Sequence, residues 1–216
     1  MLQSNSSNLL AGIRHLIFDF GGVIIGLTRN RCIEAFEQIG VDVHEKLTNN
    51  YQHKDMFMQL ELGTISPSQF RDSIRSLSEQ TLSDQQIDEA WMAMLGEVAE
   101  EKLRLLKELH KRYNTMLLSN TNLLHWEWSE RHIFSTNNHQ ISDYFHRVYL
   151  SYEMHLVKPD PEIFVQLMDD AGIRPEETLL IDDALVNCKA AEALGMRTYM
   201  PEPREDWTVL FPEISF

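Results

Sequence analysis

The chain has only two cysteines among its 216 residues, Cys32 and Cys188, with no CxxC spacing and no histidine near them at the spacing of a zinc site. Neither a disulfide framework nor a structural zinc is indicated, and a reducing compartment fits best. Long apolar runs are also missing. No stretch approaches the roughly 20 apolar residues that cross a bilayer, and the amino terminus lacks the basic start and apolar core of a signal peptide. We therefore expect a cytoplasmic protein with no membrane partner.

Basic residues are scarce relative to acidic ones. The chain has 19 Lys and Arg against 33 Asp and Glu, which gives a formal net charge of −14. Binding to nucleic acid without sequence preference needs an excess of Lys and Arg, so we expect no nucleic-acid partner. Small molecules or proteins remain as partners, and no pattern indicates an oligomeric state. An anionic substrate would be repelled at long range, so a local positive group or a metal ion must attract it.

Short apolar runs recur along the chain and predict buried strands. Four of them lie at residues 16–18, 116–118, 148–150 and 179–181, and a fifth strand is expected at 197–200 after the helix stop at Gly195. The last three of the four are separated by segments long enough to hold a helix. This alternation predicts an α/β fold with a parallel sheet and helical crossovers.

The segment 29–98 has the apolar periodicity of helices throughout. Ser66 and Ser83 each have a glutamine three residues on, which is typical of helix starts. An apolar face is expected to follow the second start, at Ile87, Ala90, Trp91, Met94, Leu95 and Val98. We predict that residues 29–98 form a helical cap over the sheet, inserted between core segments 1–28 and 99–216. Packing of these helices on the flank of the sheet is the alternative, because periodicity does not distinguish the two.

A polar residue ends each of the four runs: Asp19, Ser119, Ser151 and Asp182. The carboxyl ends of parallel strands meet at one edge of a sheet, where ligands bind. Asp19 is followed by two glycines that allow a tight loop close to a ligand. A carboxylate here that attacks phosphorus would form an aspartyl phosphate and divide one difficult displacement into two easier ones. Asp19 is therefore the candidate nucleophile.

Asp182 and Asp183 are adjacent carboxylates directly after a buried strand. Two like charges there are costly unless a cation compensates them, and hard oxygen ligands near a phosphate favour Mg²⁺. Helix capping by Asp183 is the alternative, but it explains only one of the two residues.

Ser119 and Asn120 end the second strand in a turn that offers neutral donors to phosphate oxygens, although an ordinary turn would have a similar sequence. Lys158 precedes a rigid turn, where it would neutralise both the nucleophile and the phosphoryl charge; a merely solvated lysine is the alternative. The three carboxylates would then be balanced by Mg²⁺ and Lys158, so that a phosphate dianion can enter.

Along the chain the motifs occur in the order Asp19, Ser119, Lys158-Pro159 and Asp182-Asp183. In this order they resemble the haloacid dehalogenase (HAD) superfamily of phosphatases over roughly residues 16–200. Residues 61–66 and 118–122, together with His125, are similar to the branch that contains α-D-glucose-1-phosphate phosphatase. The resemblance implies a Rossmann-like core, a small helical cap and a sugar phosphate as the substrate. It further implies that Asp19 is the nucleophile and a metal ligand. Asp183, with Asp182 beside it, and the backbone carbonyl of residue 21 would also be metal ligands. Ser119 and Lys158 would bind phosphate.

One position departs from the superfamily pattern. The usual general acid/base is an aspartate two residues after the nucleophile, and here that residue is Gly21, as in the glucose-1-phosphate phosphatase branch. Loss of a general acid/base typically slows a reaction about 10²- to 10⁴-fold. A weak or inactive protein that binds a phosphometabolite or a partner protein is therefore one alternative. A haloacid dehalogenase is a second; it would need neither that acid nor Mg²⁺, but it would not be expected to retain Asp182 and Asp183. A phosphomutase is a third, and the missing acid/base counts against it.

Overall fold

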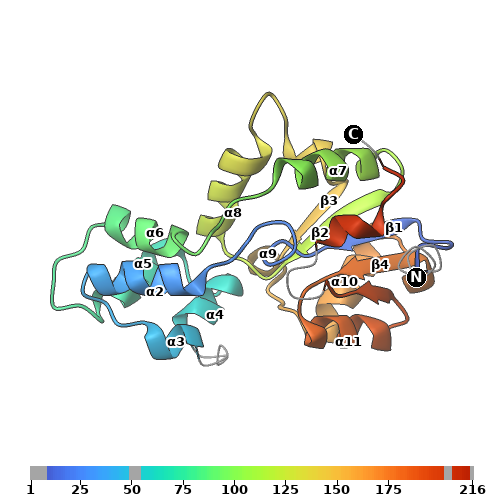
Figure 1. Cartoon of the computed structure of the whole chain (residues 1–216). Coiled ribbons are helices and arrows are strands. Elements are labelled where there is room, and N and C mark those ends of the chain that lie inside the picture. The colour runs from blue at the N-terminus through green and yellow to red at the C-terminus, as the bar shows by residue number, and fades with distance from the viewer. Residues whose placement is uncertain (1–8, 49–54, 202–205, 215–216) are drawn as a thin grey trace.

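The computed structural model describes residues 9–48, 55–201 and 206–214. Residues 1–8, whose sequence suggests no signal peptide, lie outside the described part. The five predicted strands form one fully parallel sheet in the order β3-β2-β1-β4-β5 (Figure 1). Their bounds are His15–Phe18 (β1), Asn114–Ser119 (β2), Arg147–Leu150 (β3), Thr178–Ile181 (β4) and Arg197–Tyr199 (β5). The predicted α/β class with a Rossmann-like parallel sheet is confirmed.

Helices cover both faces of the sheet, which is why its strands are apolar runs. Leu16 and Phe18 pack in one core cluster with residues of α7 (Glu100–His110) and of the 3₁₀ helix η4 (Trp207–Leu210). Ile17 points to the other face and packs in a second cluster with α10 (Pro161–Ala171) and α11 (Leu185–Ala193). Alternate residues of β1 thus bury into opposite layers.

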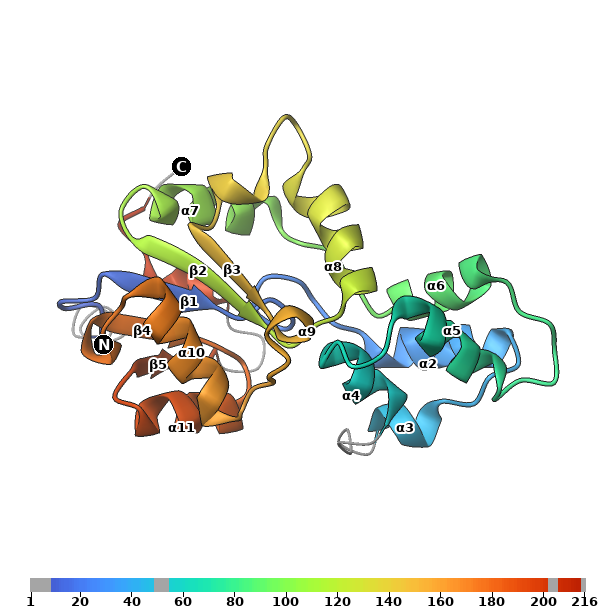
Figure 2. The same cartoon turned by 180° about the vertical axis from the view of Figure 1, so that it is seen from behind.

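Between β1 and α7, five helices of the described residues form a separate group beyond one end of the sheet (Figures 1 and 2). They are α2 (Arg29–Gln38), α3 (His44–Thr48), α4 (Met56–Glu61), α5 (Pro67–Arg75) and α6 (Asp84–Met92). This group has its own core cluster, centred on Phe36, Phe57, Phe70 and Trp91. The position of this group supports the prediction that residues 29–98 form a cap. The exact boundaries of the cap stay a prediction.

Both predicted helix starts of this group form capping boxes, at Ser66 with Gln69 and at Ser83 with Gln86. The expectation that the second apolar face continues as a helix to Val98 is wrong, because α6 ends at Met92. Beyond it the chain pairs with the other linker between core and cap: the Thr28 amide donates to the Met94 carbonyl at 2.9 Å, and the Gly96 amide donates to the Gly26 carbonyl at 2.8 Å. Leu95 and Val98 instead pack with the core of the sheet.

The turn after α4 contacts the core directly, at α9 (Ser151–Met154). The Ser151 hydroxyl lies 2.7 Å from the Glu61 carbonyl, and Nδ1 of His155 lies 2.8 Å from the Leu62 carbonyl. Gly63 has φ +64°, and a Cβ there would lie 2.1 Å from the Tyr152 carbonyl oxygen. Only glycine permits this approach, so the turn is fixed against α9. Across the described ranges, the structure contains no helix long and apolar enough to span a membrane.

Candidate active site

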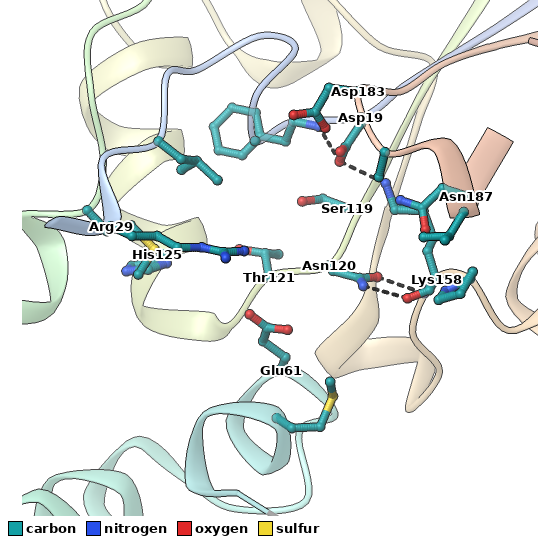
Figure 3. Close-up of a pocket in the computed structure, with 18 of the residues that line it drawn as sticks. Asp19, Arg29, Glu61, Ser119, Asn120, Thr121, His125, Lys158, Asp183 and Asn187 are labelled. Atoms are coloured by element: carbon teal, nitrogen blue, oxygen red, sulfur yellow. Dashed lines mark hydrogen bonds and ion pairs between the residues drawn. The ribbon is translucent and has the colours of Figure 1, made fainter. Parts of the chain in front are cut away.

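Asp19 follows β1 directly and lies at the carboxyl edge of the sheet. Its backbone amide continues the pairing with β4, donating to the Ile181 carbonyl at 2.9 Å. The residue is 9% exposed, and its Oδ1 lies 2.7 Å from the Phe20 amide and 2.8 Å from Nζ of Lys158 (Figure 3). Oδ2 takes part in neither contact. The two contacts therefore orient the carboxylate and leave the second oxygen as the candidate nucleophilic atom.

Lys158 is buried at the floor of the site. Its Nζ lies 2.8 Å from Asp19 Oδ1 and 2.7 Å from Asp182 Oδ2. Its backbone is held by the Asn120 side chain, whose Nδ2 donates to the Lys158 carbonyl at 2.9 Å and whose Oδ1 accepts from the Lys158 amide at 2.8 Å. The attraction of the two carboxylates outweighs burial and raises the pKa of Lys158, so the ammonium is fixed in its charged form.

Asp182 is fully buried and accepts hydrogen bonds on both oxygens. Oδ1 accepts from the Ala184 amide and from Nδ2 of Asn187, both at 2.9 Å. Oδ2 accepts from Lys158 Nζ at 2.7 Å and from Asn187 Nδ2 at 3.1 Å. A carboxylate offers about four acceptor sites, so these contacts occupy them. The position of Asp182 is therefore best suited to holding Lys158.

Asp183 lies beside the loop after Asp19. Gly22 has φ +80°, and a Cβ at that position would lie 2.1 Å from Asp183 Oδ2. A glycine is thus required for the aspartate to approach the loop. The alternative that Asp183 caps the next helix is wrong: the N-cap of α11 is Ala184, and the carboxylate that accepts from the Ala184 amide belongs to Asp182.

The three aspartates bring together enough negative charge to suit a divalent cation, with Asp182 contributing charge beside the two others. One carboxylate oxygen of each of Asp19, Asp182 and Asp183 lies within 4.8 Å of the others. Burial, and then the neighbouring Asp182, raises the pKa of Asp183. Burial also raises the pKa of Asp19 to about 7, with Lys158 opposing the shift. A cation would relieve this repulsion, and hard oxygen donors fit Mg²⁺.

A cavity of about 450 Å³ lies above these groups, between the sheet edge and the cap. Six of the predicted site residues line it: Asp19, Gly21, Ser119, Asn120, Lys158 and Asp183. Asp182 lies beneath its floor. The cap and its linkers supply further walls, including Arg29, Met58, Glu61 and Met94. This volume is typical of sites for small molecules.

Two residues of the cavity wall, Glu61 and His125, have no role predicted from the sequence. Glu61 is partly exposed, and burial raises its pKa to about 7. His125 is 6% exposed and stacks on Trp91 with ring centroids 4.4 Å apart, with Nε2 lying 3.1 Å from the Trp91 carbonyl. Burial lowers the pKa of His125 to about 4. Both residues stood within the motifs that resemble the glucose-1-phosphate phosphatase branch, which was the available signal.

A family model described as haloacid dehalogenase-like hydrolase matches residues 13–195. The chain belongs to this family. It is 34% identical over 195 residues to D-ribitol-5-phosphate phosphatase from Bacteroides thetaiotaomicron, covering 90% of this chain and 95% of that protein. The predicted class of enzyme, a phosphoric monoester hydrolase, is confirmed at this level.

Solved structures agree with this HAD assignment. An HAD family enzyme from Bacteroides thetaiotaomicron, in complex with magnesium and inorganic phosphate, has 46% identity and a TM-score of 0.87, covering 92% of this chain and 99% of that one. A predicted HAD-like family hydrolase from Porphyromonas gingivalis has 36% identity and a TM-score of 0.83, covering 90% of this chain and 94% of that one.

Proposed function

We propose that this HAD phosphatase uses Mg²⁺ to hydrolyse a small phosphomonoester, a sugar or polyol phosphate, through an aspartyl phosphate on Asp19. The observation that carries the proposal is the buried Lys158 ammonium, which lies between Asp19 and Asp182 beneath a cavity bordered by Asp183. This fixed cation opposes the rise in the pKa of Asp19 that burial causes, and so favours the ionised form that a nucleophile needs.

Each predicted residue has a role in this proposal. Asp19, Asp183 and the backbone carbonyl of Gly21 would hold Mg²⁺, with Asp182 beside them chiefly orienting Lys158. When bound, the ion supplies positive charge that draws a phosphate dianion into an acidic protein. Lys158 and the buried Ser119 hydroxyl line the cavity where they would contact phosphate oxygens. Asn120 supports phosphate binding through the backbone of Lys158, although sequence reasoning assigned its amide to the phosphate itself.

The substrate class follows from the cavity walls. Arg29, Glu61 and Thr121 offer donors and acceptors to hydroxyl groups, while Met58 and Met94 cover carbon atoms. The cavity has room for a small phosphorylated polyol. D-Ribitol-5-phosphate is the substrate in the name of one relative, and a second relative binds magnesium and phosphate. These observations support a polyol or sugar phosphate here.

The test is hydrolysis of p-nitrophenyl phosphate by the purified protein with and without Mg²⁺. We expect turnover that is lost in EDTA and in Asp19→Asn, which preserves shape but removes the nucleophilic charge. A panel of phosphorylated sugars and polyols then identifies the natural substrate. Phosphate binding without any hydrolysis would instead support the binding protein that Gly21 suggests. Metal-independent release of halide from a 2-haloacid would support a dehalogenase.

A further inference from the structure

The proposed reaction lacks a proton donor at the usual position, since residue 21 is glycine. An ester oxygen that leaves phosphorus needs a proton unless its alcohol is acidic. Other groups of the cavity are unsuited to this task. Lys158 is clamped in its charged form by two carboxylates, and Nε2 of His125 lies 3.1 Å from the Trp91 carbonyl. Asp183 is needed by the proposed metal site. Glu61 is the remaining carboxyl group among the described residues that line the cavity.

Glu61 lies on the side of the cavity where a leaving group would stand. In-line attack places the leaving oxygen opposite the attacking oxygen of Asp19, and therefore toward the cap. Glu61 is the last residue of α4, on the cap wall. Figure 3 shows its carboxyl group directed into the cavity from below, with Asp19 and Ser119 on the far side.

The backbone around Glu61 is held against the core rather than by the cap alone. The Ser151 hydroxyl lies 2.7 Å from the Glu61 carbonyl. Of the next two residues, Leu62 contacts His155, which directly follows α9, and Gly63 closely approaches Tyr152 of α9. Ser151 Oγ also accepts from the amide of Thr121, in the loop after β2. One hydroxyl thus links the position of Glu61 to the phosphate-binding loop.

We propose that Glu61 is the general acid and base of this enzyme, in place of the aspartate that Gly21 replaces; this rests on the proposed function. In the first step an Asp19 oxygen attacks phosphorus, the ester P–O bond breaks, and the leaving oxygen takes the Glu61 proton to give the alcohol. In the second step a water oxygen attacks phosphorus and gives its proton to the Glu61 carboxylate. The P–O bond to Asp19 then breaks, which releases phosphate and restores both carboxyl groups.

The surroundings of Glu61 allow both protonation states near neutral pH. Burial is the main cause that raises its pKa to about 7. Of the charged groups that act on it, Arg29 at the start of α2 lowers the pKa, while Asp55 before α4 and Asp19 across the cavity raise it. Further titratable groups on the neighbouring elements are Tyr152 and Glu153 on α9, His155 beyond it, and His125, Lys158 and Asp183 on the cavity wall. A group poised near the working pH serves best as both acid and base.

The experiment compares two esters that differ in their need for a proton and carry no hydroxyl groups for Glu61 to bind. p-Nitrophenolate leaves readily without a proton, whereas the leaving group of phenyl phosphate has a pKa near 10. In Glu61→Gln we expect release of the first equivalent of alcohol, measured in a single turnover, to slow roughly 10²-fold or more for phenyl phosphate and to stay nearly unchanged for p-nitrophenyl phosphate. Steady-state turnover of both esters should fall, because the second step has lost its base. Glu61→Asp keeps the carboxyl group and should recover part of the lost rate. Glu34→Gln, an exposed position on cap helix α2, is the matched control and should behave as wild type.

A retained first turnover of p-nitrophenyl phosphate shows that Glu61→Gln is folded and that Asp19 still attacks. Equal slowing of the first turnover with both esters, or no slowing with either, would overturn the assignment. So would a higher KM with unchanged kcat, which would make Glu61 a binding residue. A wild-type protein that hydrolyses neither ester would refute the proposed function itself, so the two failures are distinct.

Discussion

His125 should make the protein less stable as the pH falls into the acid range. The imidazole is buried, stacks on Trp91 and has Nε2 3.1 Å from the Trp91 carbonyl, and burial lowers its pKa from 6.5 to about 4. Below pH 6.5 the unfolded chain therefore binds a proton that the native protein refuses, so stability falls as the pH drops. A shift of this size corresponds to about 3 kcal/mol in total, most of which is lost by pH 4.5.

Urea unfolding of wild type and His125→Gln at pH 7 and at pH 4.5, in EDTA, measures this contribution. Raised carboxyl pKa values elsewhere act in the opposite direction, so the informative quantity is the difference between the two proteins. We expect the advantage of wild type over the variant to shrink by about 2–3 kcal/mol between the two pH values. His132→Gln is the control, because His132 stacks on Trp128 and contacts its carbonyl in the same way but is exposed. A pH-independent difference for His125→Gln would refute the reasoning.

Two further substitutions test the floor of the site. Gly22→Ala should raise the Mg²⁺ concentration for half-maximal activity roughly 10- to 100-fold, because the new Cβ displaces Asp183. Gly12→Ala is the control: Gly12 has φ +76° and open space around it, so the substitution causes similar backbone strain and should leave that concentration unchanged. Lys158→Met should abolish turnover and lower the free energy of unfolding in EDTA by about 3–5 kcal/mol, because two buried carboxylates lose their cation. Lys111→Met, at an exposed position, is the control. A Lys158→Met variant as stable as wild type would contradict this reasoning.

Much of the site could be predicted from strand ends alone. A strand buried on both faces must be apolar, so the first polar residue marks where it reaches the edge of the sheet. Asp19, Ser119 and Asp182 are such residues, and parallel pairing brings them together. Their contacts were not predictable to the same degree. The Asn120 amide and the Asp182 carboxylate both hold Lys158. These contacts form only because the fold brings the loop of Lys158, 38 residues after Asn120 in the sequence, to the edge of the sheet.

The cap was harder to predict, because its relation to the core depends on tertiary contacts. Apolar periodicity indicated the helices, but the end of α6 at Met92 is set by pairing between residues 26–28 and 94–96. Glu61 could not be assigned to the cavity for the same reason. The direction of its side chain depends on the contact of its carbonyl with Ser151, which is 90 residues away in the sequence. It depends also on the close approach of Gly63 to Tyr152, which are similarly far apart in the sequence.

The move of the acid from residue 21 to the cap also has an electrostatic consequence. An aspartate at residue 21 would add a fourth carboxylate beside Asp19, Asp182 and Asp183, and would require Leu27 to shift, since a Cβ at Gly21 would lie 2.6 Å from it. A protonated Glu61 carries no charge when the phosphate dianion arrives, and it becomes an anion only after the proton has left with the alcohol. The second step then finds a base already in place. Because Glu61 belongs to the cap and Asp19 to the core, both steps require the contact between α4 and α9 to be made.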